Sequence, residues 1–171
     1  MALLDVTLYP DEPLLQEAEP ITTFDASLET LAQEMFETMY HHDGVGLAGP
    51  QVGLSKQIIV MHDPDLEPMC LVNPSIYETE GEEVGEEGCL SIPSIYAPVN
   101  RATRIRVHAL DLQGKAHDFE ATGLLARIIQ HEVDHLHGIV FLDRTDVFSR
   151  EDKLREWERV RPNVHPAAPQ S

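Results

Sequence analysis

The stretch Gln130-His131-Glu132-Val133-Asp134-His135-Leu136 decides the fold, because it predicts a helix that carries a metal site. On an α-helix residues i and i+4 share a face, so His131 and His135 can bind one metal ion with Glu132 beside it. This H-E-x-x-H pattern is typical of metal-assisted hydrolysis. In a chain with nine histidines and abundant glutamate, the pattern can also occur by chance. The motif therefore needs a third ligand before it indicates a function.

The helix around this stretch is predicted to run from Gly123 to Leu136, with Thr122 as its cap and Gly138 as its terminator. Apolar residues cover much of its circumference, which predicts a buried central helix. Two buried imidazoles need polar partners, and a single metal ion satisfies both.

The flanking sequence predicts an arm, strands and two further helices. Residues 1–23 contain three prolines among acids, which indicates an extended arm laid over the domain. Helical spacing of apolar residues predicts an amphipathic helix at Ser27–His42, capped by Asp25 or Ser27, and a C-terminal helix that begins at Ser149. We expect an α+β fold with mainly antiparallel sheets packed around the central metal-binding helix. The predicted strands are Gln57–Met61, Met69–Val72, Ile76–Glu83, a short one within Glu86–Pro93, and the hairpin of Arg104–Leu110 with Ala116–Ala121.

Length and composition favour one cytoplasmic domain. The 171 residues are enough for a core without disulfides, and the two cysteines indicate free thiols. We expect a catalytic body at residues 1–147, followed at 148–171 by a C-terminal helix and a flexible tail of the same domain. The sequence has no signal-like or membrane-spanning segment. The net charge of −18 argues against a protein that binds nucleic acid through its phosphates.

A run of four glycines spans residues 44–53 and suggests a close approach of the backbone to a ligand. It follows a predicted helix and leads to a strand, the reverse of a nucleotide-binding loop, so we reject a phosphate cradle. Within the run, Gln51 could donate a hydrogen bond to a developing oxyanion. The alternative is an ordinary turn whose glutamine is exposed.

The third metal ligand has three candidate sources. The extended pattern H-E-x-x-H-x-x-G-x-x-H fails at its last position, which is Phe141. Downstream glutamates lie only in the short C-terminal helix, which is predicted to be amphipathic and to lie on the surface. Cys89 remains, and its thiolate would complete a Cys/His/His set with one position open for water, as in catalytic sites. A buried free thiol is the alternative for Cys89 and the preferred interpretation of Cys70.

Three segments resemble, in order and spacing, the signature motifs of peptide deformylases. The resemblance covers roughly residues 1–147, and the chain beyond Arg150 matches only as a C-terminal helix. Two positions differ from the family pattern. Gly49 stands where the family usually has alanine, a change expected to have little effect, and Arg127 stands where an apolar residue near the substrate pocket is usual. The three segments are Gly44–Gln51, Glu87–Ser91 and His131–His135.

The resemblance implies a catalytic role for the matching residues. Glu132 would act as general acid and base, and the oxyanion would be held by Gln51 and the backbone N–H of Leu90. A metal-activated water would attack the formyl carbon of an N-formyl-methionyl peptide and release formate with a free amino terminus. The implied metal ligands are Cys89, His131 and His135.

The resemblance also implies where the substrate lies. Its backbone would pair with a strand formed by Val45, Gly46 and Leu47, and its methionine side chain would enter a pocket near Val45, Leu124 and Ile128. We further hypothesise that three charged residues orient the metal ligands, although ordinary surface charges are the alternative. These residues are Glu87, Arg101 and Asp134.

The implied cofactor is one divalent metal ion per chain, with Fe²⁺ favoured from the resemblance and Zn²⁺ as the alternative. The implied partners are N-formyl-methionyl peptides and, transiently, the ribosome through the C-terminal helix; no membrane and no sequence-specific nucleic acid are expected. Residues 150–161 carry five basic and four acidic residues, a net charge of +1, which supports ribosome binding only weakly. Two other functions remain open: a zinc endopeptidase, and a non-catalytic metal-binding module associated with the ribosome.

Overall fold

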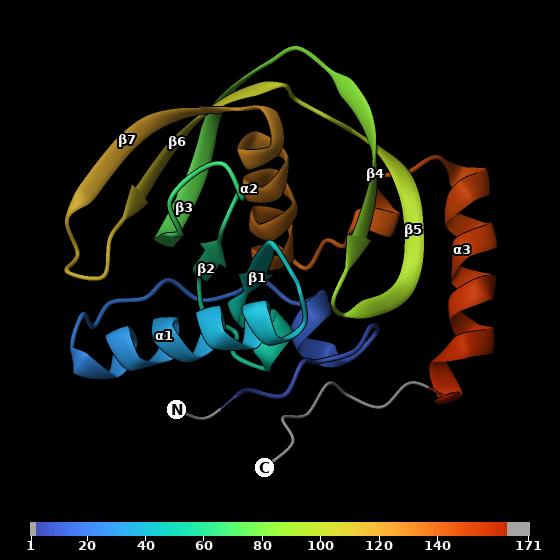
Figure 1. Cartoon of the computed structure of the whole chain (residues 1–171), viewed down its shortest axis with the longest axis horizontal. Coiled ribbons are helices and arrows are strands. Elements are labelled where there is room, and N and C mark those ends of the chain that lie inside the picture. The colour runs from blue at the N-terminus through green and yellow to red at the C-terminus, as the bar shows by residue number, and fades with distance from the viewer. Residues whose placement is uncertain (1–2, 164–171) are drawn as a thin grey trace.

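The helix predicted around the two histidines forms and lies in the middle of the molecule. The computed structural model describes residues 3–163. In it, α2 (Gly123–Leu136) has the predicted bounds and Thr122 as its N-cap. Figure 1 shows α2 between a large sheet and a separate hairpin. Ten of its residues are buried, including both histidines of the motif, so the prediction of a buried central helix is confirmed.

A five-stranded antiparallel sheet packs against α2. Its strand order is β1-β2-β3-β6-β7. Alternate residues of β2 serve two faces, because Ile59 and Met61 pack with α2 whereas Ile58 and Val60 pack on the opposite side. The sheet therefore has α2 on one face and a second helix on the other. The strands are β1 (Gly46–Ala48), β2 (Ile58–Met61), β3 (Met69–Glu80), β6 (Arg104–Leu110) and β7 (Ala116–Thr122).

The second helix is α1 (Ala26–His41), which confirms the predicted amphipathic helix. The Asp25 side chain accepts hydrogen bonds from the backbone N–H groups of Ser27 and Leu28, so Asp25 is the N-cap. Met35 and Met39 are fully buried against the sheet, as expected for methionines that fill a core. The glycine-rich run follows the end of this helix and lies in the middle of the molecule.

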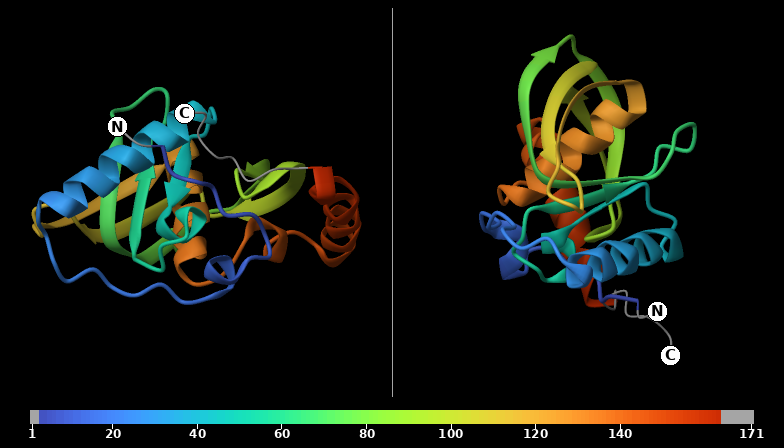
Figure 2. Two further views of the ribbon diagram at one scale, coloured as in Figure 1. Left: turned by 90° about the horizontal axis from the view of Figure 1, so that it is seen from below. Right: turned by 90° about the vertical axis from the view of Figure 1, so that its left-hand side faces the viewer.

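A two-stranded hairpin forms the other wall around α2. It consists of β4 (Glu83–Cys89) and β5 (Ile92–Arg101), and it does not join the larger sheet. The helix α3 (Val147–Val160) packs on β5 through the fully buried Trp157. Figure 1 shows α3 at the outer side of the hairpin, and the left view of Figure 2 places it at the same end.

Three predictions of local structure were wrong. Met69–Val72 and Ile76–Glu80 belong to one strand, β3, because Asn73 adopts a positive φ of 50° and lets the strand continue through an irregularity. The predicted end of the second strand, Glu83, is instead the first residue of β4. The short strand expected within Glu86–Pro93 is part of the longer β4–β5 hairpin. The C-terminal helix begins at Val147 rather than at Ser149, because Asp146 is its cap and accepts a hydrogen bond from the Ser149 N–H.

The predicted fold class is confirmed, because helices and antiparallel sheets surround α2. No helix within residues 3–163 is both long and apolar enough to cross a membrane. The flexible tail was predicted for residues beyond the last helix, and residues 164–171 lie outside the described part. The division at residues 147 and 148 stays a prediction.

The N-terminal arm ties together the three motif segments. It is extended except for a short 3-10 helix at Glu12–Leu15. Three of its backbone N–H groups donate hydrogen bonds to carbonyls, two within motif segments and one directly after the third segment. The arm therefore fixes how these distant segments lie relative to one another. The pairs are Thr7 with Gln51 at 2.7 Å, Tyr9 with Ser91 at 2.9 Å, and Ala18 with Leu136 at 2.8 Å.

Candidate metal centre

Cys89, His131 and His135 come together at one point. The two histidines lie one turn apart on α2 with ring centroids 5.0 Å apart, and both are buried. Cys89 ends β4, where the pairing with β5 shifts register, and its Sγ lies 3.4 Å from Nε2 of His135. One ligand atom from each of the three residues lies within 4.8 Å of the others. Among residues 3–163 this is the one group of three such side chains with that geometry.

The arrangement fits a divalent metal ion with an open coordination position. One thiolate and two imidazoles are a common ligand set for a divalent ion that also binds a water. Nearby, Oε1 of Glu132 is buried and has no hydrogen-bond partner within the described residues. A buried acceptor of this kind requires a donor, and a water bound beside the three ligands would supply one.

Glu132 lies against the glycine-rich run. A Cβ atom placed on Gly46 would come within 2.5 Å of Oε2 of Glu132, so only glycine leaves room for this carboxyl. Burial raises the pKa of Glu132 to about 7, although the charge of His131 opposes the rise. A carboxyl with this pKa can both accept and return a proton near neutral pH.

A buried ionic network holds the histidine helix to the hairpin. Oε1 of Glu87 lies 3.0 Å from Nδ1 of His131. Arg101 donates two hydrogen bonds to Glu87, each 2.9 Å long, and one of 2.7 Å to Asp134. Burial disfavours a charged Glu87, but hydrogen bonds from His131 and Arg101 outweigh burial and lower the pKa of Glu87 to about 2. The structure thus brings together all three charged residues that were expected to orient the ligands.

Gln51 is buried rather than exposed, so the alternative of an ordinary exposed turn is wrong. It lies on the 3-10 helix Gly49–Val52 and is 1% exposed. Its Oε1 accepts a hydrogen bond of 2.9 Å from the Ala48 N–H. Its Nε2 donates to Oγ of Ser91 at 3.2 Å and to Sγ of Cys89 at 3.3 Å. The amide therefore has a fixed orientation, with its donor group directed at the metal centre.

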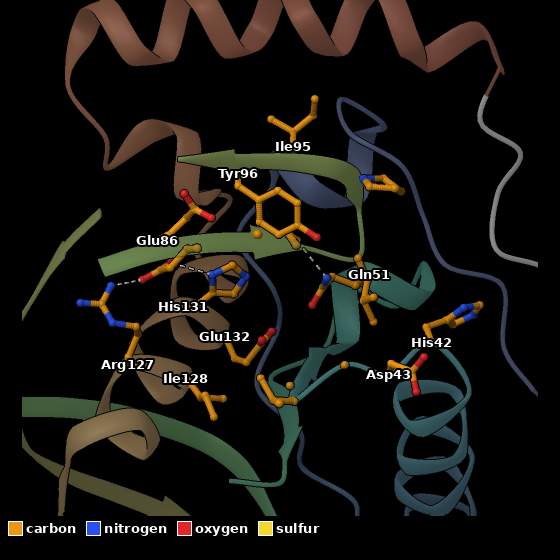
Figure 3. Close-up of a pocket in the computed structure, with 18 of the residues that line it drawn as sticks. His42, Asp43, Gln51, Glu86, Ile95, Tyr96, Arg127, Ile128, His131 and Glu132 are labelled. Carbon is orange, nitrogen blue, oxygen red and sulfur yellow. Dashed lines mark hydrogen bonds and ion pairs between the residues drawn. The ribbon is translucent and has the colours of Figure 1, made fainter. Parts of the chain in front are cut away.

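A cavity of about 720 Å³ opens beside these residues. Figure 3 shows it between Tyr96 and Glu86 of the hairpin and Ile128 and Glu132 of α2, with Gln51 at its side. A space of this size accommodates a side chain and part of a peptide backbone. Four predicted substrate contacts line it, together with Leu90 of the predicted oxyanion site. These contacts are Val45, Gly46, Leu124 and Ile128.

The strand predicted to pair with the substrate backbone begins one residue later than expected. β1 begins at Gly46, although the Val45 carbonyl still accepts a hydrogen bond from the His62 N–H. β1 pairs only with β2 and is therefore an edge strand, which leaves its other edge open to a peptide. The side chain of Leu47 is fully buried in the core with α1, so Leu47 could contact a peptide only through its backbone.

Some contacts of the site were missed by sequence reasoning. Ser91 is fully buried and is held by Gln51, and a serine between Leu90 and Ile92 in an apolar run was the available signal. Arg144 donates two hydrogen bonds to Asp134, and no pattern in the sequence indicates this pairing. Arg127, noted only as unusual, forms a hydrogen bond of 2.7 Å to Glu87.

Known proteins resemble this chain over nearly its whole length. The polypeptide deformylase family model matches residues 3–151. A peptide deformylase of Chromobacterium violaceum is 46% identical over 164 residues, which cover 93% of this chain and 98% of that protein. Peptide deformylase 1 of Bacillus cereus is 47% identical over 155 residues, covering 90% and 99% of the two chains.

Solved structures give the same result. A peptide deformylase from Legionella pneumophila superposes with a TM-score of 0.86 at 41% identity, covering 96% of this chain and all of that one. The protein from Ehrlichia chaffeensis gives a TM-score of 0.88 at 35% identity, with 95% and 98% coverage. The likeness thus extends over the arm, the sheet, the hairpin and the metal-binding helix.

Proposed function

The chain belongs to the peptide deformylase family, and on that premise we propose which of its residues remove the formyl group from N-formyl-methionyl peptides. The family consists of metallohydrolases that act on nascent polypeptides. The observation that carries the assignment of residues is the convergence of Cys89, His131 and His135 beside the buried carboxyl of Glu132. The two other functions left open by the sequence find no support in the comparisons.

Cys89, His131 and His135 would hold the metal ion, which when bound lowers the pKa of a coordinated water and polarises a carbonyl group. The peptide extends β1 at its open edge, and the methionine side chain enters the cavity between Leu124, Ile128 and Val45. This pose places the formyl carbon next to Glu132.

Glu132 accepts the proton of the attacking water, and the water oxygen bonds to the formyl carbon. Gln51 Nε2 and the Leu90 backbone N–H donate to the oxyanion that develops on the formyl oxygen. Glu132 then returns its proton to the amide nitrogen, the C–N bond breaks, and formate and a free amino terminus leave. The raised pKa of Glu132 suits both proton transfers.

Formate release tests this assignment. The metal-loaded enzyme is offered formyl-Met-Ala-Ser and the same peptide without the formyl group. We expect formate from the first peptide, no internal cleavage of either, and no formate release by a Glu132→Ala variant that keeps its metal. Internal cleavage of the unformylated peptide would instead indicate an endopeptidase.

For the metal, we favour Fe²⁺ and keep Zn²⁺ as the alternative. The Cys/His/His set suits either ion, and Zn²⁺ generally binds such sites more tightly. Metal content and turnover are compared between anaerobic and aerobic preparations of the same protein. If Fe²⁺ is the working ion, turnover per bound metal is higher in the anaerobic preparation and falls on exposure to air.

We also propose a cytoplasmic location and a transient contact of α3 with the ribosome, where nascent formylated chains emerge. Support comes from the position of α3 on the outside of the molecule (Figure 1). The side chain of Arg155 on this helix is largely exposed. Co-sedimentation with ribosomes at low salt tests the contact. An Arg155→Glu variant should sediment less than the wild type, and equal sedimentation of both proteins argues against α3 as the contact.

A further inference from the structure

Arg127 lies on the face of α2 that borders the cavity. It is one turn before His131 and three residues after Leu124, so the helical spacing places it on one face with a residue that would hold the first substrate side chain. Its side chain lines the cavity and is 17% exposed. No role in catalysis follows from this position, because the guanidinium carries no proton that it can exchange.

The cavity separates α2 from the hairpin, and Arg127 spans the gap. The backbone of α2 packs mainly on β1, β2 and β7. Across the cavity, Nη1 of Arg127 donates to Oε2 of Glu87 at 2.7 Å and to the Val99 carbonyl at 3.0 Å. Nη2 donates to the Glu83 carbonyl at 2.7 Å. One side chain thus binds both strands of the hairpin and connects them to the helix.

Gly85 of β4 provides the surface on which the guanidinium lies. A Cβ atom at Gly85 would lie 3.0 Å from Cζ of Arg127, 3.1 Å from Nη2 and 3.3 Å from Nε. Because Cζ is the nearest of the three atoms, this Cβ would sit above the plane of the guanidinium and not at its edge. The guanidinium therefore stacks face-on against the bare backbone of Gly85, and any side chain there would push it away.

We propose that Arg127 is a specificity-determining residue, which fixes the distance between α2 and β4 and so sets the width of the pocket for the first substrate side chain. The inference rests on the proposed substrate position in this cavity. A planar group with three hydrogen bonds to two strands resists both widening and narrowing of the gap. Since close packing distinguishes side chains by size, a fixed gap favours the thin, unbranched methionine over a broad aromatic ring.

The experiment compares kcat/KM for formyl-Met-Ala-Ser and formyl-Phe-Ala-Ser. Arg127→Met keeps a similar volume and loses every hydrogen bond of the guanidinium. We expect its preference for the methionine peptide to fall about tenfold, mainly through KM, because β4 near Gly85 is no longer held to α2 and its displacement admits the larger side chain. Arg127→Lys keeps the charge without the planar fork and should restore only part of the preference.

Gly85→Ala tests the same contact from the other side, because it leaves all polar groups in place and displaces only the guanidinium. Its preference should fall in the same direction as that of Arg127→Met. Arg106→Met is the matched control, since it removes an arginine paired with Asp118 on the sheet and should leave the preference unchanged. Metal content and thermal unfolding are measured for each variant.

An unchanged preference, within about twofold, in either Arg127→Met or Gly85→Ala would overturn the inference if that variant is folded and retains one metal ion. Should Arg127→Met fail to fold, Gly85→Ala decides the question. If the wild type releases no formate from formyl-Met-Ala-Ser, the proposed assignment of the active site fails instead, so the two failures are distinguishable.

Discussion

Oε1 of Glu87 lies 3.0 Å from Nδ1 of His131, which leaves Nε2 of the same ring free to face Cys89 and His135. A carboxylate on Nδ1 fixes the tautomer and orientation of a metal-binding imidazole and raises its basicity. Because Arg101 and Arg127 hold Glu87 in turn, the position of His131 depends on residues that never touch the metal.

Replacing Glu87 with glutamine should weaken metal binding roughly 10–100-fold while leaving the three ligands in place. The neutral amide accepts a weaker hydrogen bond from the His131 N–H than the carboxylate does. It also leaves Arg101 and Arg127 without the carboxylate that they share. Competition with a chromophoric chelator measures the affinity. Glu78→Gln, at an exposed position of β3, is the control and should bind metal as the wild type does. Equal affinities for the Glu87 variant and the wild type would contradict the prediction.

Glu87 should also make the metal-free protein sensitive to acid. Its pKa is about 2 in the folded protein against an ordinary value of 4.5, so the ionised carboxylate stabilises the fold. This contribution, about 3 kcal/mol, is fully present above the ordinary pKa and is lost as the pH falls towards the folded value. Urea unfolding is measured at about pH 6 and about pH 3. Glu87→Gln should lose less stability over this interval than the wild type, and an equal loss in both proteins would argue against the assignment.

A methyl group on Gly46 should impair turnover more than binding. In Gly46→Ala the new Cβ would meet Oε2 of Glu132 at 2.5 Å and Cγ2 of Ile128 at 3.0 Å, so the carboxyl must move. Displacing the proton acceptor by about 1 Å should lower kcat roughly 100-fold. Steady-state deformylation, with metal content as a check, measures the effect. The control is Gly44→Ala, whose Cβ would meet the movable end of the Leu90 side chain and not Glu132. If Gly46→Ala keeps the wild-type kcat, Glu132 can shift without any loss of turnover.

Local patterns predicted α1 and α2, whereas the extent of the β4 strand depends on pairing that such patterns do not show. The bounds of α2 follow from periodic apolar residues between Thr122 and Gly138, all of which are visible in the sequence. The β4 strand contains little apolar alternation in Glu83–Cys89 and exists because it pairs with β5. That pairing cannot be read from β4 alone, since strand formation depends on the partner.

The sequence alone indicated the candidate metal ligands that the structure brings together, but not most of the residues that hold them in position. The i, i+4 spacing of His131 and His135 is a local signal. The contact between Glu87 and His131 joins residues 44 positions apart, and only the fold brings them together. The role of Gly49 could not be predicted from the sequence either. A Cβ atom there would lie 2.5 Å from the Lys56 carbonyl oxygen, so only glycine permits this close approach of two backbone segments. Its neighbours in sequence do not indicate this contact.

Ser91 should prove necessary for the orientation of Gln51. The serine is fully buried, and its Oγ accepts one hydrogen of the Gln51 amide at 3.2 Å, while the Ala48 N–H holds the amide oxygen at the opposite end. In Ser91→Ala the amide keeps its anchor at Ala48 but can rotate its donor away from the position of the oxyanion. Since an oxyanion donor acts mainly in the transition state, we expect kcat to fall about tenfold with little change in KM, a smaller loss than the roughly 100-fold expected for Gln51→Leu. The double variant should be no slower than Gln51→Leu alone, because Ser91 acts through Gln51. If the loss of kcat in the double variant equals the product of the two single losses, the serine acts independently of the Gln51 amide.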